Sequence, residues 1–215
     1  MAIKIDYSSY PDRERRSAFT SSLIPESPYP SAGVPVPECR KIAKSLKSPD
    51  IEIRYIEDIL IKGIVIFSKK ESFSDKIPQI EAFLPFLVSW MVTDIAGPSL
   101  YCRKEDREEA YSYFLSLIDR DEEMTKRLGI VTLMSEFLTQ DKLAEELGKI
   151  ASIHTDHYLL QMAVAWFTAT AYTKFPEETI PYFMRLDENI KKKAKQKCRD
   201  SRRINSEYKE RLKSI

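Results

Sequence analysis

The sequence has little glycine and little cysteine: five glycines and three cysteines in 215 residues. So few glycines, beside many leucines, isoleucines, lysines and glutamates, favour helices. The cysteines, Cys39, Cys102 and Cys198, are odd in number and show no CxxC spacing. They therefore signal neither a disulfide framework nor a zinc site, and a reducing, cytoplasmic environment is expected.

Long apolar runs are also missing. The most apolar stretches, ILIKGIVIF and IEAFLPFLVSWMV, are too short or too interrupted to span a bilayer, and the first residues lack the apolar core of a signal peptide. No GxxxxGKS/T, GxGxxG or GxSxG motif occurs, which removes the commonest signals of nucleotide binding and serine hydrolysis. His154 and His157 have no further ligand cluster near them, so we expect no metal. We also expect no other cofactor, and the short apolar runs predict no membrane partner.

Net charge is small, at +1, but it is unevenly distributed. Residues 191–213 carry eleven lysines and arginines against three acids. Such a segment can follow a phosphate backbone, or it can be the solvated face of a lysine-rich helix. Composition does not choose between these two interpretations.

Amphipathic segments of helical period follow one another along the chain. Apolar positions in residues 59–67 recur at helical spacing despite many β-branched side chains, so we expect a buried helix there. The spacing predicts helices at roughly 11–22, 37–47, 50–69, 75–84, 86–96, 104–118, 121–138, 140–152, 157–173, 176–185 and 187–213.

Short turns between these segments predict an all-α fold of paired, stacked helices, with a compact irregular bundle as the alternative. The length requires no more than one domain. We therefore expect a single helical-repeat domain over residues 1–215, comprising a lead-in segment (1–32), a repeat body (33–206) and a basic C-terminal end (207–215).

Trp90 and Asp94 are four residues apart, so on a helix they share a face. An indole face attracts positive charge and a carboxylate neutralises it, so this pair can hold a cationic group. Each residue also has an ordinary structural interpretation. Trp90 can pack in the core, and Asp94 can bond to backbone near a helix end. Arg127, a further candidate residue, can pair with Glu123 one turn earlier.

Several short motifs occur in an order that resembles a known family. They are GVPVPECRKIAKSL (33–46), W-x-x-x-D at Trp90 and Asp94, KRLGIVTLM around Arg127, AVAW ending at Trp166, and KQKCRDSRRIN (195–205). The separations from Trp90 through Trp166 are 4, 33 and 39 residues. This arrangement is similar to that of the AlkD-like DNA alkylation repair enzymes, over about residues 23–206.

The resemblance implies an all-α solenoid of HEAT-like helix pairs with a concave, DNA-binding surface. It implies an N-glycosylase that excises cationic 3- or 7-alkylpurines from duplex DNA without a metal. Trp90, Asp94 and Trp166 then match the catalytic cleft, Arg127 the DNA-contacting arginine, and Arg40 the arginine after the G-V-x-x-P turn.

The basic tail adds further candidates for phosphate contacts: Lys192, Lys195, Arg199, Arg202 and Arg203. The expected partner is duplex DNA that carries alkylated bases, bound by a monomer. Two alternatives stay open: a non-catalytic member of the same fold that binds DNA structures, and a helical-repeat scaffold whose basic tail meets an acidic protein.

Overall fold

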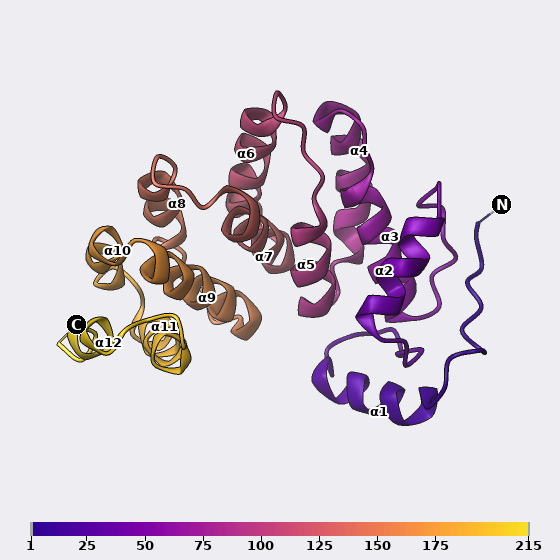
Figure 1. The fold of residues 1–215 in the computed structure, drawn as a ribbon, viewed down its shortest axis with the longest axis horizontal. Coiled ribbons are helices and arrows are strands. Elements are labelled where there is room, and N and C mark those ends of the chain that lie inside the picture. The colour runs from indigo at the N-terminus through magenta and orange to yellow at the C-terminus, as the bar shows by residue number, and fades with distance from the viewer. Residues whose placement is uncertain (1, 215) are drawn as a thin grey trace. The chain divides into compact units, whose positions relative to one another are not determined.

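A computed structural model describes residues 2–214, and within them the chain forms helices and no β-strand (Figure 1). The prediction of an all-α fold is confirmed. The α-helices of the described residues are α1 (Arg13–Leu23), α2 (Val36–Ser45), α3 (Ile56–Ser68), α4 (Phe73–Phe83), α5 (Trp90–Ala96), α6 (Arg107–Ser116), α7 (Glu123–Thr132), α8 (Leu143–Ile150), α9 (Tyr158–Lys174), α10 (Pro176–Phe183), α11 (Glu188–Asp200) and α12 (Ser206–Arg211).

The chain divides into two compact units, residues 1–110 and 111–215, with α6 crossing the boundary. Within each unit, helices pack against helices close to them in sequence, as expected of a helical repeat. The single domain over residues 1–215 and its concave surface stay predictions. Within the described part of the chain, no helix is both long and apolar enough to cross a bilayer.

Helix α3 is the centre of the first unit. Every residue from 56 to 67 except Lys62 is buried. A helix buried on all sides needs partners all round it, and α2, α4 and α5 supply them. At Gly63, a Cβ would lie 2.8 Å from the Phe83 ring of α4 and 3.1 Å from the Cβ of Ala96 on α5. A side chain there would push both helices away.

The buried helix predicted within residues 59–67 is confirmed, but its predicted start near residue 50 is wrong. Helix α3 begins at Ile56 because the preceding residues pair with the N-terminal segment. The N–H of Ile3 donates to the carbonyl of Asp50 at 2.7 Å, and the N–H of Glu52 donates to the carbonyl of Ile3 at 2.9 Å. These contacts hold the backbone extended there.

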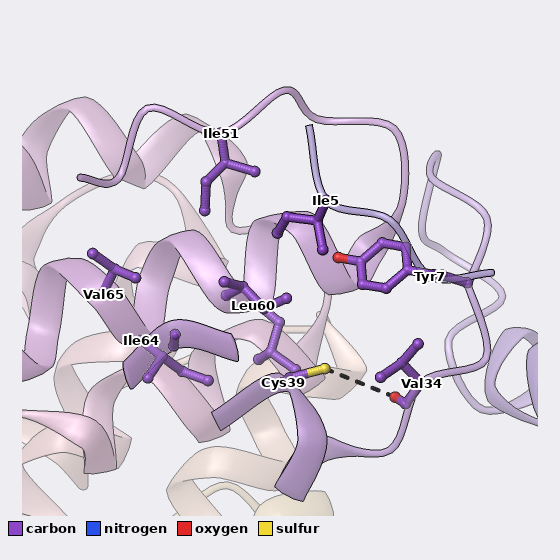
Figure 2. Close-up of a cluster of buried hydrophobic side chains, with 11 residues drawn as sticks. Ile5, Tyr7, Val34, Cys39, Ile51, Leu60, Ile64 and Val65 are labelled. Carbon is purple, nitrogen blue, oxygen red and sulfur yellow. Dashed lines mark hydrogen bonds between the residues drawn. The ribbon is translucent and has the colours of Figure 1, made fainter. Parts of the chain in front are cut away.

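The N-terminal segment contributes to the hydrophobic core. Figure 2 shows the side chains of Ile5 and Tyr7 in the same cluster as Leu60 of α3. In the same cluster the Sγ of Cys39, on α2, lies 3.8 Å from the carbonyl oxygen of Val34. All five residues are buried. The start of the chain therefore folds together with α2 and α3.

A buried carboxylate at the first turn of α3 organises the loop before α2. The two oxygens of Glu57 accept hydrogen bonds of 2.6 to 3.3 Å from the hydroxyl of Ser31 and the backbone N–H groups of Ala32, Gly33 and Val34. A helix N-terminus favours negative charge, and these donors replace the water that the carboxylate loses.

The neighbouring carboxylate, Asp58, binds the N-terminal segment in the same way. It accepts hydrogen bonds from the Tyr7 hydroxyl at 2.7 Å and from the backbone N–H groups of Arg54 and Tyr55 at 2.9 Å each. Burial and the contact with Asp58 raise the pKa of Tyr7 well above its usual range. The hydroxyl is therefore a permanent donor.

Helix α1 is attached to this loop by a close backbone contact at Gly33. The φ angle of Gly33 is 75°, in the left-handed region, and a Cβ there would lie 2.1 Å from the carbonyl oxygen of Arg13. The Nε of Arg13 donates to the carbonyl of Ala32 at 3.0 Å, and the hydroxyl of Ser17 donates to the carbonyl of Ser31 at 2.7 Å. Only glycine fits this crossing.

A buried cation closes the other end of α3. The ammonium of Lys76 donates to the carbonyls of Phe67 and Lys69 at 2.8 and 3.0 Å, and to that of Tyr101 at 2.8 Å. Positive charge is stabilising at a helix C-terminus. Burial lowers the pKa of Lys76 to about 8, but the three carbonyls suit its charged form.

Helix α9 is the centre of the second unit and packs against α7, α10 and α11. The single helix predicted over residues 187–213 is wrong, because the structure divides it into α11 and α12. Asn205 starts α12, since its side chain accepts a hydrogen bond from the N–H of Tyr208 at 2.9 Å. The carbonyl of Tyr208 accepts another from the Tyr172 hydroxyl on α9, also at 2.9 Å.

Glu57→Ala is expected to lower the free energy of unfolding by about 3 kcal/mol, because it leaves a buried hydroxyl and backbone donors without their acceptor. Chemical denaturation followed by circular dichroism measures this. Glu52→Ala is the control, since that exposed carboxylate lies 4.0 Å from Arg54 and contributes at most about 1 kcal/mol. Equal losses in the two variants would contradict the role of Glu57.

Glu146 on α8 predicts an unusual pH dependence of stability. Its side chain is fully buried, and neither carboxylate oxygen has a hydrogen-bond partner among the described residues. Burial, and then repulsion from Glu145 and Asp141 partly offset by Lys174 and Lys142, raises its pKa to about 8. The folded state therefore prefers the protonated form. Its contribution to stability is complete below about pH 4.5 and is lost as the pH rises to about 8.

Glu146→Gln keeps the shape of the side chain and removes the charge. We expect it to melt like the wild type at pH 4.5 and to be more stable at pH 8, by on the order of 3 kcal/mol. Thermal melts at several pH values measure the difference. The exposed Glu207, also in the second unit, provides the control Glu207→Gln. A gain that does not grow with pH would refute this interpretation.

Candidate functional site

Trp90 and Asp94 lie on α5, one turn apart, as the spacing predicts. Ser89 starts this helix, because its side chain accepts a hydrogen bond from the N–H of Met91 at 3.2 Å. Trp90 is the first helical residue, and both it and Asp94 are partly exposed. The structural alternative for Trp90, a side chain packed in the core, therefore does not describe it.

Polar contacts orient both side chains. The indole N–H of Trp90 donates to the carbonyl of Leu23, the last residue of α1, at 3.0 Å. The hydroxyl of Thr93 lies 2.9 Å from Oδ1 of Asp94 and 2.9 Å from the carbonyl of Trp90. Thr93 itself is buried, so it holds its partners from the core side of α5. Trp90 and Asp94 are thus held in place and remain partly exposed.

Arg40 reaches the same helix from α2. Its Nη1 donates to the hydroxyl of Ser99 at 2.9 Å, and this hydroxyl donates to the carbonyl of Ile95 at 2.6 Å. Ile95 follows Asp94 directly. In the first unit, Arg40 is thus anchored to the turn that follows α5, the helix that carries Trp90 and Asp94.

Arg127 and Trp166 belong to the second unit. Arg127, on α7, is only 5% exposed, and its Nη1 donates to the carbonyl of Leu159 on α9. This bond ties the two helices together. A phosphate contact at Arg127, and a single site made with Trp90 and Asp94, stay predictions.

Trp166 lies on α9 with 37% of its surface exposed. The ammonium of Lys197, on α11, lies 5.8 Å from the centre of a ring of Trp166. Beside them is an open pocket of about 520 Å³, which is also lined by Lys174, Arg202 and Arg203. Four cationic side chains, one carboxylate (Asp200) and one indole thus line a space whose net charge is positive, which favours an anionic ligand.

The basic tail exposes its predicted residues on one face. Lys192, Lys195 and Arg199 recur three and four residues apart on α11, and none of them is buried. Arg202 and Arg203 are exposed in the turn before α12. Their contact with DNA stays a prediction.

Two lysines were not singled out from the sequence. Lys193 and Lys197, one turn apart on α11, each lie beside an aromatic ring of α9. The spacing of four between lysines was visible in the sequence. Their neighbours on α9 were not, because those contacts join residues more than 30 positions apart.

The two histidines have structural contacts. The Nδ1 of His157 accepts a hydrogen bond from the N–H of Leu160 at 3.3 Å, so His157 caps α9. His154 lies 2.8 Å from Asp187. Among the residues described, no group of three or more His, Cys, Asp or Glu side chains is arranged to hold a metal ion.

The fold and these surfaces define an all-helical protein with a cationic face that contains exposed aromatic rings. Such a face suits a polyanion. The family model of the DNA alkylation repair enzymes matches residues 8–203, and the chain belongs to this family. Membership gives the protein a role in DNA repair and implies contact with DNA. A search of curated proteins and a search of solved structures each found no match.

Replacing Lys192, Lys195 and Arg199 with glutamine tests the exposed face of α11. If these side chains contact phosphates, affinity for duplex DNA falls for all sequences alike. The slope of log affinity against log salt should decrease by about one for each lost contact. Binding titrations at several salt concentrations provide both quantities.

A charge-matched control is a triple variant of exposed lysines in the first unit, Lys47, Lys70 and Lys104. Its salt slope should stay close to that of the wild type. An unchanged slope in the α11 variant would make this face an ordinary solvated surface.

Proposed function

We propose that this protein is a DNA N-glycosylase that excises cationic 3- or 7-alkylpurines from duplex DNA. The observation that carries the proposal is a partly exposed carboxylate, Asp94, one turn from the indole of Trp90, in a chain of the DNA alkylation repair family. Such a pair is suited to a cation rather than to an anion.

The chemistry requires little from the enzyme at the leaving group. An alkylated purine of this kind already carries positive charge, so it leaves without further protonation. The bond from C1′ to the base nitrogen breaks, and its electron pair neutralises the base. Positive charge then develops on the sugar, as in glycoside hydrolysis.

Asp94 can act on that sugar cation in two ways. Its carboxylate stabilises the developing charge, and it orients a water molecule whose oxygen forms the new bond to C1′ while the proton passes to the carboxylate. The hydrogen bond from Thr93 holds the carboxylate in place. Trp90 would face the sugar with its ring, and Trp166 stays a candidate catalytic residue of the second unit.

The arginines and the basic tail would bind the phosphates. Arg40 is the best placed of them in the first unit, because it is anchored to the turn that follows α5. Arg127 and the exposed residues of α11 would extend these contacts. Phosphate contacts position the duplex and carry no base specificity.

Asp94→Asn keeps the shape of the side chain and removes its charge. We expect base release to fall by about 10² to 10³-fold while DNA binding is retained, the usual scale for one preorganised electrostatic group. The assay incubates protein with methylated duplex DNA and quantifies free 3-methyladenine and 7-methylguanine. Asp50→Asn, an exposed aspartate in the same unit, is the matched control.

The outcomes separate the alternatives. Equal base release by the wild type and Asp94→Asn would refute the mechanism. If the wild type binds DNA and releases no base, the protein is a DNA-structure-binding member of the family. Absence of DNA binding would favour a scaffold for an acidic protein.

A further inference from the structure

Two large aromatic side chains are exposed on one side of α9. Tyr158 is 61% exposed and Trp166 is 37% exposed, whereas most of α9 is buried. They are eight residues apart, which is about 12 Å along a helix.

Each ring has a lysine of α11 beside it. The ammonium of Lys193 lies 5.8 Å from the centre of the Tyr158 ring, and that of Lys197 lies 5.8 Å from the Trp166 ring. The order is the same on both helices, so two pairs of a lysine and an aromatic ring follow one another along α9 and α11. We call Tyr158, Trp166, Lys193 and Lys197 the aromatic–lysine row.

The row ends at the cationic pocket. Lys197 and Trp166 line it together with Lys174, Arg202 and Arg203. Asp200 also lines the pocket, so four cations face one carboxylate and the net charge is positive. A chain of phosphates that follows the two lysines would therefore continue into a space of net positive charge. All of these groups belong to the second unit.

We propose that an unpaired DNA strand binds along the aromatic–lysine row. In a duplex the flat faces of the bases are stacked inside, so exposed rings gain little from it. Unpaired bases can stack on Tyr158 and Trp166, while the lysines and the pocket take the phosphates. The row thereby gives the protein a second mode of DNA binding, which does not depend on Asp94 or on base excision.

The test uses the full chain and a dye-labelled oligothymidylate of twelve nucleotides, followed by fluorescence anisotropy. The wild type should bind it, and a duplex of equal length should compete less well. Tyr158→Ala should weaken binding about tenfold, the scale for one lost base–aromatic stack. Lys193→Gln should reduce the salt slope by about one or slightly less.

Two control variants remove the same types of side chain at positions outside the aromatic–lysine row. Tyr182→Ala removes a tyrosine of α10 that also lies beside a cation, Arg185, and Lys70→Gln removes an exposed lysine of the first unit. Both should bind the oligonucleotide like the wild type. Circular dichroism confirms that each variant is folded.

A second measurement observes stacking directly. The sequence has two tryptophans, so Trp90→Phe leaves Trp166 as the sole indole, and its emission should be quenched as the oligonucleotide binds. Asp94→Asn should bind the oligonucleotide normally, which separates this proposal from the glycosylase mechanism. Wild-type affinity in Tyr158→Ala, equal competition by duplex, or no binding at low salt would overturn it. The last outcome would leave the row to an acidic protein partner.

Discussion

The first unit depends on the burial of α3 together with its polar ends. A helix that is apolar on every side has to be enclosed, yet its two ends present unpaired backbone groups. At the N-terminal end, Glu57 and Asp58 accept hydrogen bonds from other segments of the chain. At the C-terminal end, Lys76 of α4 donates to the carbonyl of Phe67 in α3 and to that of Tyr101. The charges have the signs that the helix dipole favours. Enclosing α3 therefore also fixes the segments that supply those partners.

The candidate site of the first unit follows from this arrangement. Glu57 holds the loop from Ser31 to Val34, and that loop carries both the start of α2 and the contact with α1. Helix α2 brings Arg40 to the end of α5, and the last carbonyl of α1 receives the indole of Trp90. The orientation of Trp90 thus depends on residues that contribute nothing to chemistry. Variants of the loop are expected to affect the site through its geometry.

In the second unit, one helix, α9, has both a buried side and exposed aromatic side chains. Most of α9 is packed against its neighbours, while Tyr158 and Trp166 remain exposed next to the lysines of α11. Cation–aromatic contacts at exposed positions contribute little to stability, on the order of 1 kcal/mol or less. The exposure of both rings is the observation on which the proposed binding of an unpaired strand rests. In the same unit, the carboxyl of Glu146 is buried without a hydrogen-bond partner among the described residues, so stability is lost there as the pH rises.

The sequence by itself determined that the chain is helical, because helical periodicity is a local property that each segment carries alone. It also predicted the family and the shared face of Trp90 and Asp94, since short motifs and a spacing of four survive without knowledge of packing. The structure decided what depends on residues distant in the chain. Backbone hydrogen bonds with Ile3 make α3 begin later than predicted. Hydrogen bonds of Asn205 and Tyr172 with Tyr208 accompany the division of the C-terminal segment into α11 and α12, and Arg127 is buried against Leu159. Burial and hydrogen bonding belong to pairs of segments, and a single sequence does not state which segments meet.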